Sequence, residues 1–159
     1  MSEKHRQFAG GCRCGSLRYQ LRDDPLFVHA CHCLNCQKSA NSVFGITTIV
    51  LEKDIDLNSG KVVAKPMPEA PHRFMHVCGS CGDHIFTTAT NHPATALLKT
   101  GTLDDLRDIT INAHISTKRK HEWLALPENV PQFQDGYDRD SVWPRESLER
   151  LRRAIEDIT

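Results

Sequence analysis

The chain has 159 residues, which is enough for one domain with a buried core and too few for two. Its 20 lysines and arginines balance 20 aspartates and glutamates, so the formal net charge is +0 and no global field would attract nucleic acid or an anionic membrane. No stretch of about 18 apolar residues could span a bilayer, so we expect neither nucleic acid nor a membrane as a partner.

Residues 1–10 carry several charges and no apolar stretch of the length found in signal peptides. We therefore expect a soluble, cytoplasmic protein. Seven cysteines are many for such a protein, and an odd number without a secretion signal fits poorly with a framework of disulfides. Metal binding explains the cysteines better.

From residue 8 to about residue 126 the sequence consists of short β-rich pieces separated by glycine and polar clusters. The clearest predicted strands are residues 16–21, 44–51, 84–87 and 109–115. Residues 58–71 contain three prolines and a glycine, so we expect an irregular surface loop there and no core strand. These features predict a mainly β domain over residues 8–126.

After residue 126 the composition changes to a loop rich in proline and aspartate, and Pro144 then opens a stretch of good helix formers. Apolar residues recur there at helical spacing, at Leu148, Leu151, Ile155 and Ile158. We therefore predict that residues 127–159 form a loop and a short amphipathic C-terminal α-helix. Its apolar stripe would pack on the same domain or make a homodimer contact.

All seven cysteines belong to three short motifs: Cys12-x-Cys14, Cys31-x-Cys33-x-x-Cys36 and Cys78-x-x-Cys81. The segment Cys78-Gly-Ser-Cys81-Gly has the form of a zinc knuckle, which supplies two thiolates to a tetrahedral ion that needs four. The other two can come from Cys12 and Cys14, because side chains two apart share one face of an extended segment.

Thiolates on one zinc ion lie about 3.7 Å apart, because each Zn–S bond is about 2.3 Å long and the geometry is tetrahedral. Side chains two apart on a flat strand start roughly 6.6 Å apart, so the segment holding the first cysteine motif must bend. Gly10, Gly11 and Gly15 flank it and would permit the bend. We therefore predict a closed structural zinc site made by Cys12, Cys14, Cys78 and Cys81.

Cys31, Cys33 and Cys36 remain, as an extended pair followed by a turn. Three protein ligands and one free position are typical of a catalytic zinc, so we predict a second, catalytic ion at these three cysteines and two Zn2+ per chain. A four-cysteine site made from this motif and one knuckle cysteine is the alternative division, but it leaves the remaining thiols without a role.

Histidines offer a way to close the second site. His29 shares a strand face with Cys31 and Cys33, and its binding would make the site structural, whereas His32 should point the other way. The other histidines that we considered lack metal-ligand spacing and are expected to be surface or hydrogen-bonded residues: His76, His84, His92 and His114.

The residues around the cysteines form a specific pattern, in residues 10–19, residues 31–36, Phe74 and residues 78–82, with later landmarks at residues 101–105, residues 114–115 and Trp123. In this pattern the chain closely resembles the glutathione-dependent formaldehyde-activating enzyme (GFA) family, to which a domain of centromere protein V is related. The resemblance spans roughly residues 8–126, which we therefore expect to be a GFA-like zinc-binding domain.

The resemblance implies an Mss4-like, mainly β fold, with structural zinc on the first four cysteines and catalytic zinc on Cys31, Cys33 and Cys36. It also implies a carbon–sulfur lyase similar to S-(hydroxymethyl)glutathione synthase, with a small thiol such as glutathione and an aldehyde as partners. Relatives usually carry arginine and then glycine where this chain has Gln37 and Asn41. Asn41 can keep the left-handed backbone of glycine, whereas Gln37 lacks a charge that could hold an anionic thiol.

Two other functions compete with this interpretation. One is a zinc-stabilised binding module of Mss4-like fold that performs no chemistry, which a closed or inaccessible second site would favour. The other is a thiol-based reductase, because the wider fold group includes methionine sulfoxide reductases. That chemistry needs a spare cysteine of low pKa, and the division of the cysteines leaves none.

Overall fold

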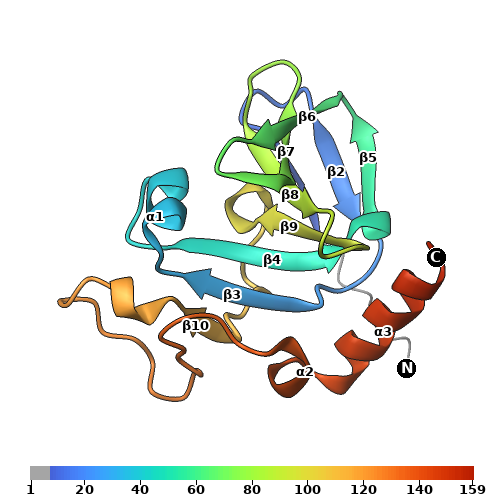
Figure 1. Cartoon of the computed structure of the whole chain (residues 1–159). Helices are drawn as coiled ribbons and strands as arrows, with labels where there is room; N and C mark the ends of the chain where they lie inside the picture. Colours follow the sequence, from blue (N-terminus) through green and yellow to red (C-terminus); the bar gives the residue numbers. More distant parts are fainter. Residues whose placement is uncertain (1–7) are drawn as a thin grey trace.

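The structure is a computed structural model that describes residues 8–159, and the predicted absence of a signal peptide falls largely on residues 1–7, outside this range. Its strands form two sheets (Figure 1). The small sheet is antiparallel and contains β1 (Ala9–Gly11), β2 (Arg18–Leu21) and β5 (Ile55–Ser59). The predicted mainly β fold is confirmed.

The large sheet has seven strands in the order β10-β3-β4-β9-β8-β7-β6, and only the β10–β3 pair is parallel. Its strands are β3 (Phe27–Cys31), β4 (Gly45–Leu51), β6 (Val62–Met67), β7 (Ala70–Cys78), β8 (His84–Ala89), β9 (Thr95–Lys99) and β10 (Ala113–Ile115). Three short 3-10 helices are η1 (Glu52–Asp54), η2 (Thr100–Thr102) and η3 (Thr117–Arg119).

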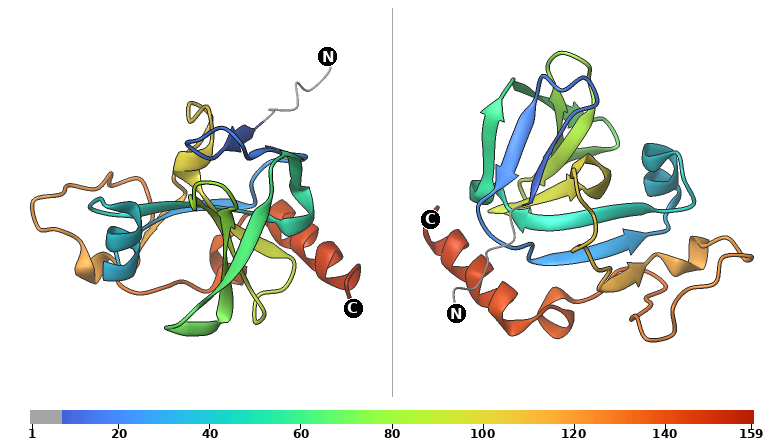
Figure 2. Two further views of the ribbon diagram at one scale, coloured as in Figure 1. Left: turned by 90° about the horizontal axis from the view of Figure 1, so that it is seen from above. Right: turned by 180° about the vertical axis from the view of Figure 1, so that it is seen from behind.

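Three α-helices complete the fold: α1 (Leu34–Ala40), α2 (Arg139–Val142) and α3 (Arg145–Glu156). Figure 1 shows α1 and α3 at opposite ends of β3 and β4, and the view from behind in Figure 2 agrees. Among residues 8–159, no helix has both the length and the apolar character needed to cross a bilayer.

The large sheet is buried on both faces. On β4, Val50 belongs to a core that also contains Tyr19 of the small sheet, whereas its neighbour Ile49 belongs to a second core with Leu151 of α3. Successive side chains of a strand point to opposite faces, so the two cores lie on opposite sides of this sheet. The large sheet therefore has a packed core on each face, and two of its strands, β3 and β7, end at Cys31 and Cys78.

The prediction of an irregular loop at residues 58–71 was wrong. These residues contain the end of β5, all of β6 and the start of β7, and Gly60 makes the turn between β5 and β6 with a φ of +76°. β6 is the edge strand of the large sheet and is mostly exposed, so the missing N–H of Pro66 is tolerated there. The prediction failed because an exposed edge strand lacks alternating apolar residues.

The predicted C-terminal helix is present and begins after Pro144, which serves as its N-cap. Leu148 and Leu151 are buried against the large sheet, as the helical spacing indicated. Ile158 is an exception, because the helix ends at Glu156 and leaves this side chain 61% exposed.

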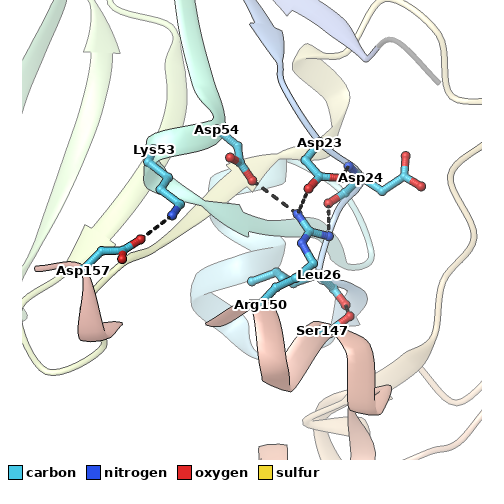
Figure 3. Close-up of polar contacts among 8 residues, drawn as sticks. All are labelled: Asp23, Asp24, Leu26, Lys53, Asp54, Ser147, Arg150 and Asp157. Atoms are coloured by element: carbon cyan, nitrogen blue, oxygen red, sulfur yellow. Dashed lines mark hydrogen bonds and ion pairs between the residues drawn. The ribbon is translucent and has the colours of Figure 1, made fainter. Parts of the chain in front are cut away.

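Charged contacts also fasten α3 to the sheets (Figure 3). The Arg150 guanidinium lies 3.2 Å from a carboxylate oxygen of Asp23 and 3.3 Å from one of Asp54, and it donates a hydrogen bond to the Asp24 carbonyl at 2.9 Å. The Asp54 side chain is only 12% exposed, and this burial raises its pKa although Arg150 acts in the opposite direction. Arg150 therefore offsets part of the cost of burying the Asp54 carboxylate.

We expect Arg150→Ala to lower the free energy of unfolding by about 2 kcal/mol, because it leaves a nearly buried carboxylate unpaired. Urea unfolding followed by circular dichroism measures this. The matched control is Arg152→Ala on the exposed side of the same helix, which should change stability by less than about 0.5 kcal/mol. Equal effects of the two substitutions would contradict the structural role of Arg150.

Candidate metal centres

The fold brings the seven cysteines together in two groups, and all seven are free thiols. The four-cysteine cluster contains Cys12, Cys14, Cys78 and Cys81, and the three-cysteine cluster contains Cys31, Cys33 and Cys36. Within each cluster the sulfur atoms lie within 4.8 Å of one another. The predicted division of the cysteines is therefore the one that the fold produces.

The four-cysteine cluster joins two tight connections, one between β1 and β2 and the other between β7 and β8. The bend predicted between Cys12 and Cys14 is a turn, in which the Gly15 N–H donates to the Cys12 carbonyl at 3.1 Å. Gly15 and Gly82 follow the two cysteine motifs with φ of +77° and +78°, a backbone conformation that favours glycine. The turn brings the sulfurs of Cys12 and Cys14 to 3.3 Å.

Hydrogen-bond donors surround these sulfurs. The backbone N–H of Leu17 donates to the Cys12 sulfur at 3.3 Å, and that of Ser80 donates to the Cys78 sulfur at 3.4 Å. The Ser16 hydroxyl lies 3.4 Å from the Cys78 sulfur, and its hydrogen bond is the largest cause that lowers the pKa of Cys78 to about 6. These donors favour the thiolate form of Cys78, whereas the pKa of Cys81 is raised to about 11.

An ion pair that the sequence did not reveal links the β1–β2 connection to the β7–β8 connection. Arg13 lies between the first two cysteines, and its side chain contacts the Asp83 carboxylate through Nε at 2.8 Å and through a terminal nitrogen at 2.6 Å. The Arg13 backbone N–H also donates to this carboxylate, at 2.7 Å. The paired side chains are 70 positions apart, so no local pattern could have indicated them.

The three-cysteine cluster lies where β3 ends and α1 begins. Cys31 is the last residue of β3, Cys33 is the N-cap of α1 and accepts a hydrogen bond from the Cys36 N–H at 3.4 Å, and Cys36 lies on the helix. The sequence predicted only a turn here. The helix ends at Asn41, whose φ of 48° confirms the expected left-handed conformation.

Gly45 at the start of β4 lets the strand pass close to this cluster. A Cβ atom at Gly45 would lie 3.3 Å from the Cys36 Cβ, which is tighter than ordinary contact. Within the cluster, the hydrogen bond that Cys31 accepts from Cys36 is the main cause lowering the pKa of Cys31 to about 5, and it raises the pKa of Cys36. At least one thiolate is therefore available near neutral pH, as metal binding requires.

His29 does not join the three-cysteine cluster. Its Nδ1 lies 3.1 Å from the Tyr137 hydroxyl oxygen, and burial lowers its pKa to about 4. His32 is buried and contacts His114, with Nε2 and Nδ1 3.0 Å apart. Across residues 8–159, neither cluster includes a histidine, so the second group consists of three cysteines alone.

Two further residues border the three-cysteine cluster. The Ser116 hydroxyl oxygen lies 3.9 Å from the Cys31 sulfur, and Ser116 has a φ of 55°, which is unusual for serine. The side-chain amide of Gln37 donates to the carbonyls of His32 and Arg119 at 2.7 and 3.1 Å. Its amide is thus occupied in joining α1 to the η3 segment.

A cavity of about 500 Å³ adjoins α1. Its walls include Ser39 and Ala40 of the helix, Gly45 beside Cys36, and Lys99 of β9. The Lys99 ammonium donates to the Ser39 hydroxyl at 2.9 Å and has no carboxylate within 4.0 Å in the described part of the chain. Among residues 8–159, no cysteine lines this cavity, and Gly45 alone connects it to the three-cysteine cluster.

The donor sets fit zinc. Four thiolates satisfy the tetrahedral coordination of a structural ion, and three thiolates leave one position for another ligand. Soft sulfur donors without carboxylates or histidines favour zinc over magnesium or calcium. Both clusters could therefore hold metal ions, the first as a closed site and the second as an open one.

Comparison with known protein families identifies one family for this chain. A family model described as glutathione-dependent formaldehyde-activating enzyme matches residues 7–119, a range that contains all seven cysteines. No curated protein matches the chain significantly. A crystal structure of a Rhodobacter sphaeroides protein is similar with a TM-score of 0.48 and 14% identity, covering 78% of this chain and 98% of that one.

Proposed function

Because the chain belongs to the glutathione-dependent formaldehyde-activating enzyme family, we propose that it is a zinc-dependent carbon–sulfur lyase that joins a small thiol such as glutathione to formaldehyde. The observation that carries this proposal is the three-cysteine cluster, which no histidine among residues 8–159 closes and which borders a cavity of about 500 Å³ through Gly45. We assign the four-cysteine cluster to structural zinc and the three-cysteine cluster to catalytic zinc, within a domain spanning residues 8–126 and extended by residues 127–159.

In the proposed reaction, the thiol sulfur attacks the aldehyde carbon. A C–S bond forms, the C=O π bond breaks, and the proton released by the thiol ends on the former carbonyl oxygen. Zinc held by Cys31, Cys33 and Cys36 would supply a soft site that lowers the pKa of the substrate thiol. Since these three thiolates already carry net negative charge, the sulfur stays nucleophilic and delivery of the thiol is favoured over strong polarisation of the aldehyde.

The chain's own residues supply position and hydrogen bonds. Gln37 holds α1 against the η3 segment and thereby fixes Cys36 relative to Cys31. The Ser116 hydroxyl faces Cys31 and can donate to the oxygen that gains charge as the C–S bond forms. Lys99 lies in the adjoining cavity, where its charge can hold a carboxylate of the thiol.

Carbon-13 exchange spectroscopy tests the proposed activity, because thiols add to formaldehyde without a catalyst and only exchange rates reveal acceleration. We expect the zinc-loaded protein to accelerate exchange between formaldehyde and S-(hydroxymethyl)glutathione and Cys36→Ser to abolish the acceleration. Wild-type protein that contains zinc and leaves the exchange rate unchanged would refute the activity.

One observation favours a second candidate, a zinc-stabilised binding module without chemistry. Gln37 removes the positive charge that relatives carry beside the third central cysteine, and its amide is occupied by backbone carbonyls. A protein that binds two zinc ions and neither glutathione nor another thiol would match this candidate.

A further inference from the structure

A second cavity, of about 380 Å³, lies on the face of the large sheet that α3 also covers. Its apolar wall includes Ile49 of β4, Leu97 of β9 and Trp143, and residues 137–140 border it on the side of α2. It shares no lining residue with the cavity beside α1. The proposed reaction therefore leaves this second cavity without a role.

Two arginines, Arg73 and Arg139, line the second cavity, and the Nε atom of each lacks a hydrogen-bond acceptor. The Nε atoms of Arg73 on β7 and Arg139 on α2 are buried and have no hydrogen-bond partner. Within residues 8–159, no carboxylate oxygen lies within 4.0 Å of either guanidinium. The Arg139 guanidinium is instead positioned 5.8 Å from the centroid of the Trp143 ring. A buried N–H group without an acceptor is unfavourable, so an anion that enters the cavity and accepts from either Nε would be stabilised.

The other polar groups of the second cavity are consistent with this charge. His92 lines the same cavity as both arginines, and burial first and then the charges of Arg139 and Arg73 lower its pKa. Two carboxylates also border the cavity. Asp138 is occupied as the N-cap of α2, where it accepts a hydrogen bond from the Ser141 hydroxyl, and Asp140 is exposed to water.

His29 also lines the second cavity and can supply an imidazole N–H there. The Trp143 indole N–H donates to the Tyr137 hydroxyl oxygen at 3.0 Å, so the Tyr137 hydrogen is free to point at His29 Nδ1, 3.1 Å away. The imidazole proton then resides on Nε2, where it can be donated to a ligand in the cavity.

We propose that the second cavity binds the carboxylate group of a small organic anion, which Arg73 and Arg139 hold while the apolar wall surrounds its carbon skeleton. Paired guanidinium donors match the two oxygens of a carboxylate. Tyr137, Arg139 and Trp143 lie beyond residues 7–119, so the site extends outside the family match.

The carboxylate could belong to the thiol substrate or to a separate acid. His29 precedes Cys31 by two positions on the same face of β3, a distance of roughly 6.6 Å along a strand. A peptide thiol with several carboxylates can span more than this distance. The shared chemistry of both sources is a carboxylate on a small, partly apolar skeleton.

Trp143 provides a direct readout. The chain has two tryptophans, so Trp123→Phe leaves Trp143 as the only one, in the wall of the cavity. We would titrate this variant with benzoate and with neutral benzamide of the same size, at constant ionic strength, and follow tryptophan fluorescence. We expect benzoate to bind at least about tenfold more tightly than benzamide, because it forms charge-assisted hydrogen bonds.

In the same background, Arg73→Gln and Arg139→Gln should each weaken benzoate binding about tenfold or more and reduce its preference over benzamide. Arg145→Gln is the matched control, because its side chain is 91% exposed and pairs with Glu149 outside the cavity. Equal binding of benzoate and benzamide to the parent protein would overturn the proposal, and so would unchanged benzoate affinity in both cavity variants.

S-methylglutathione distinguishes the two sources of the carboxylate. Displacement of benzoate by this compound would identify the thiol substrate, whereas continued benzoate binding in its presence would identify a separate acid. Neither measurement needs turnover, so both can be repeated in Cys36→Ser. A failure of the exchange activity and a failure of this site are therefore distinguishable.

Discussion

Cys78→Ser is expected to abolish cooperative folding of the chain. Zinc in a closed thiolate site contributes on the order of 10 kcal/mol to the folding of small zinc domains, which is comparable to the whole stability of an ordinary domain. Cys78 is only 2% exposed and belongs to the core between the two sheets, beside Ile85 and Tyr19. The substitution would therefore remove a buried ligand, and loss of the metal would release the two connections that the cluster joins.

Circular dichroism and urea unfolding measure this effect. The matched control is Ser80→Ala, which changes an exposed side chain inside the same motif and removes no sulfur. We expect that variant to retain two zinc ions and to unfold at nearly the parent urea concentration. A folded Cys78→Ser protein with parent stability would contradict the structural assignment of the four-cysteine cluster.

Cys36→Ser is expected to have the opposite profile: the second zinc and the exchange activity are lost while the fold remains. Cys36 lies on α1, a helix with no buried residue, so the two cores do not depend on it. Zinc content per chain should fall from two to one, with a change in stability of about 1–2 kcal/mol. Elemental analysis, unfolding and carbon-13 exchange measure the three quantities on one preparation.

The control for this substitution is Asn35→Ala, one position earlier on the exposed side of α1. It should preserve both zinc ions and the exchange rate. If Cys36→Ser unfolds outright, or if Asn35→Ala also loses zinc, the three-cysteine cluster has a structural role and the proposed division between the two sites is wrong.

The grouping of the cysteines could be predicted from sequence because spacing and coordination number restrict it strongly. Seven thiols, two of them in a knuckle and two on one face of a short segment, leave three for a second site. The assignment of catalytic and structural roles stays a prediction, as does the division of the chain at residue 126.

Other elements carry little signal in the sequence. α1 buries no side chain, so its residues show no apolar periodicity, and β6 is an exposed edge strand interrupted by Pro66. The two arginines of the second cavity, Arg73 and Arg139, come from distant parts of the chain and meet only through the fold. Periodicity predicts what is buried along one element, whereas sites assembled from several elements require the tertiary structure.

The most direct test of the two-metal assignment combines zinc content with X-ray absorption at the zinc edge, on protein purified with zinc and without added thiol. We expect two zinc ions per chain and a first shell dominated by sulfur at about 2.3 Å, with no histidine scattering. Cys36→Ser should contain one zinc with four sulfur ligands. One zinc per chain in the parent protein, or a histidine in its coordination shell, would contradict a closed four-cysteine site beside an open three-cysteine site.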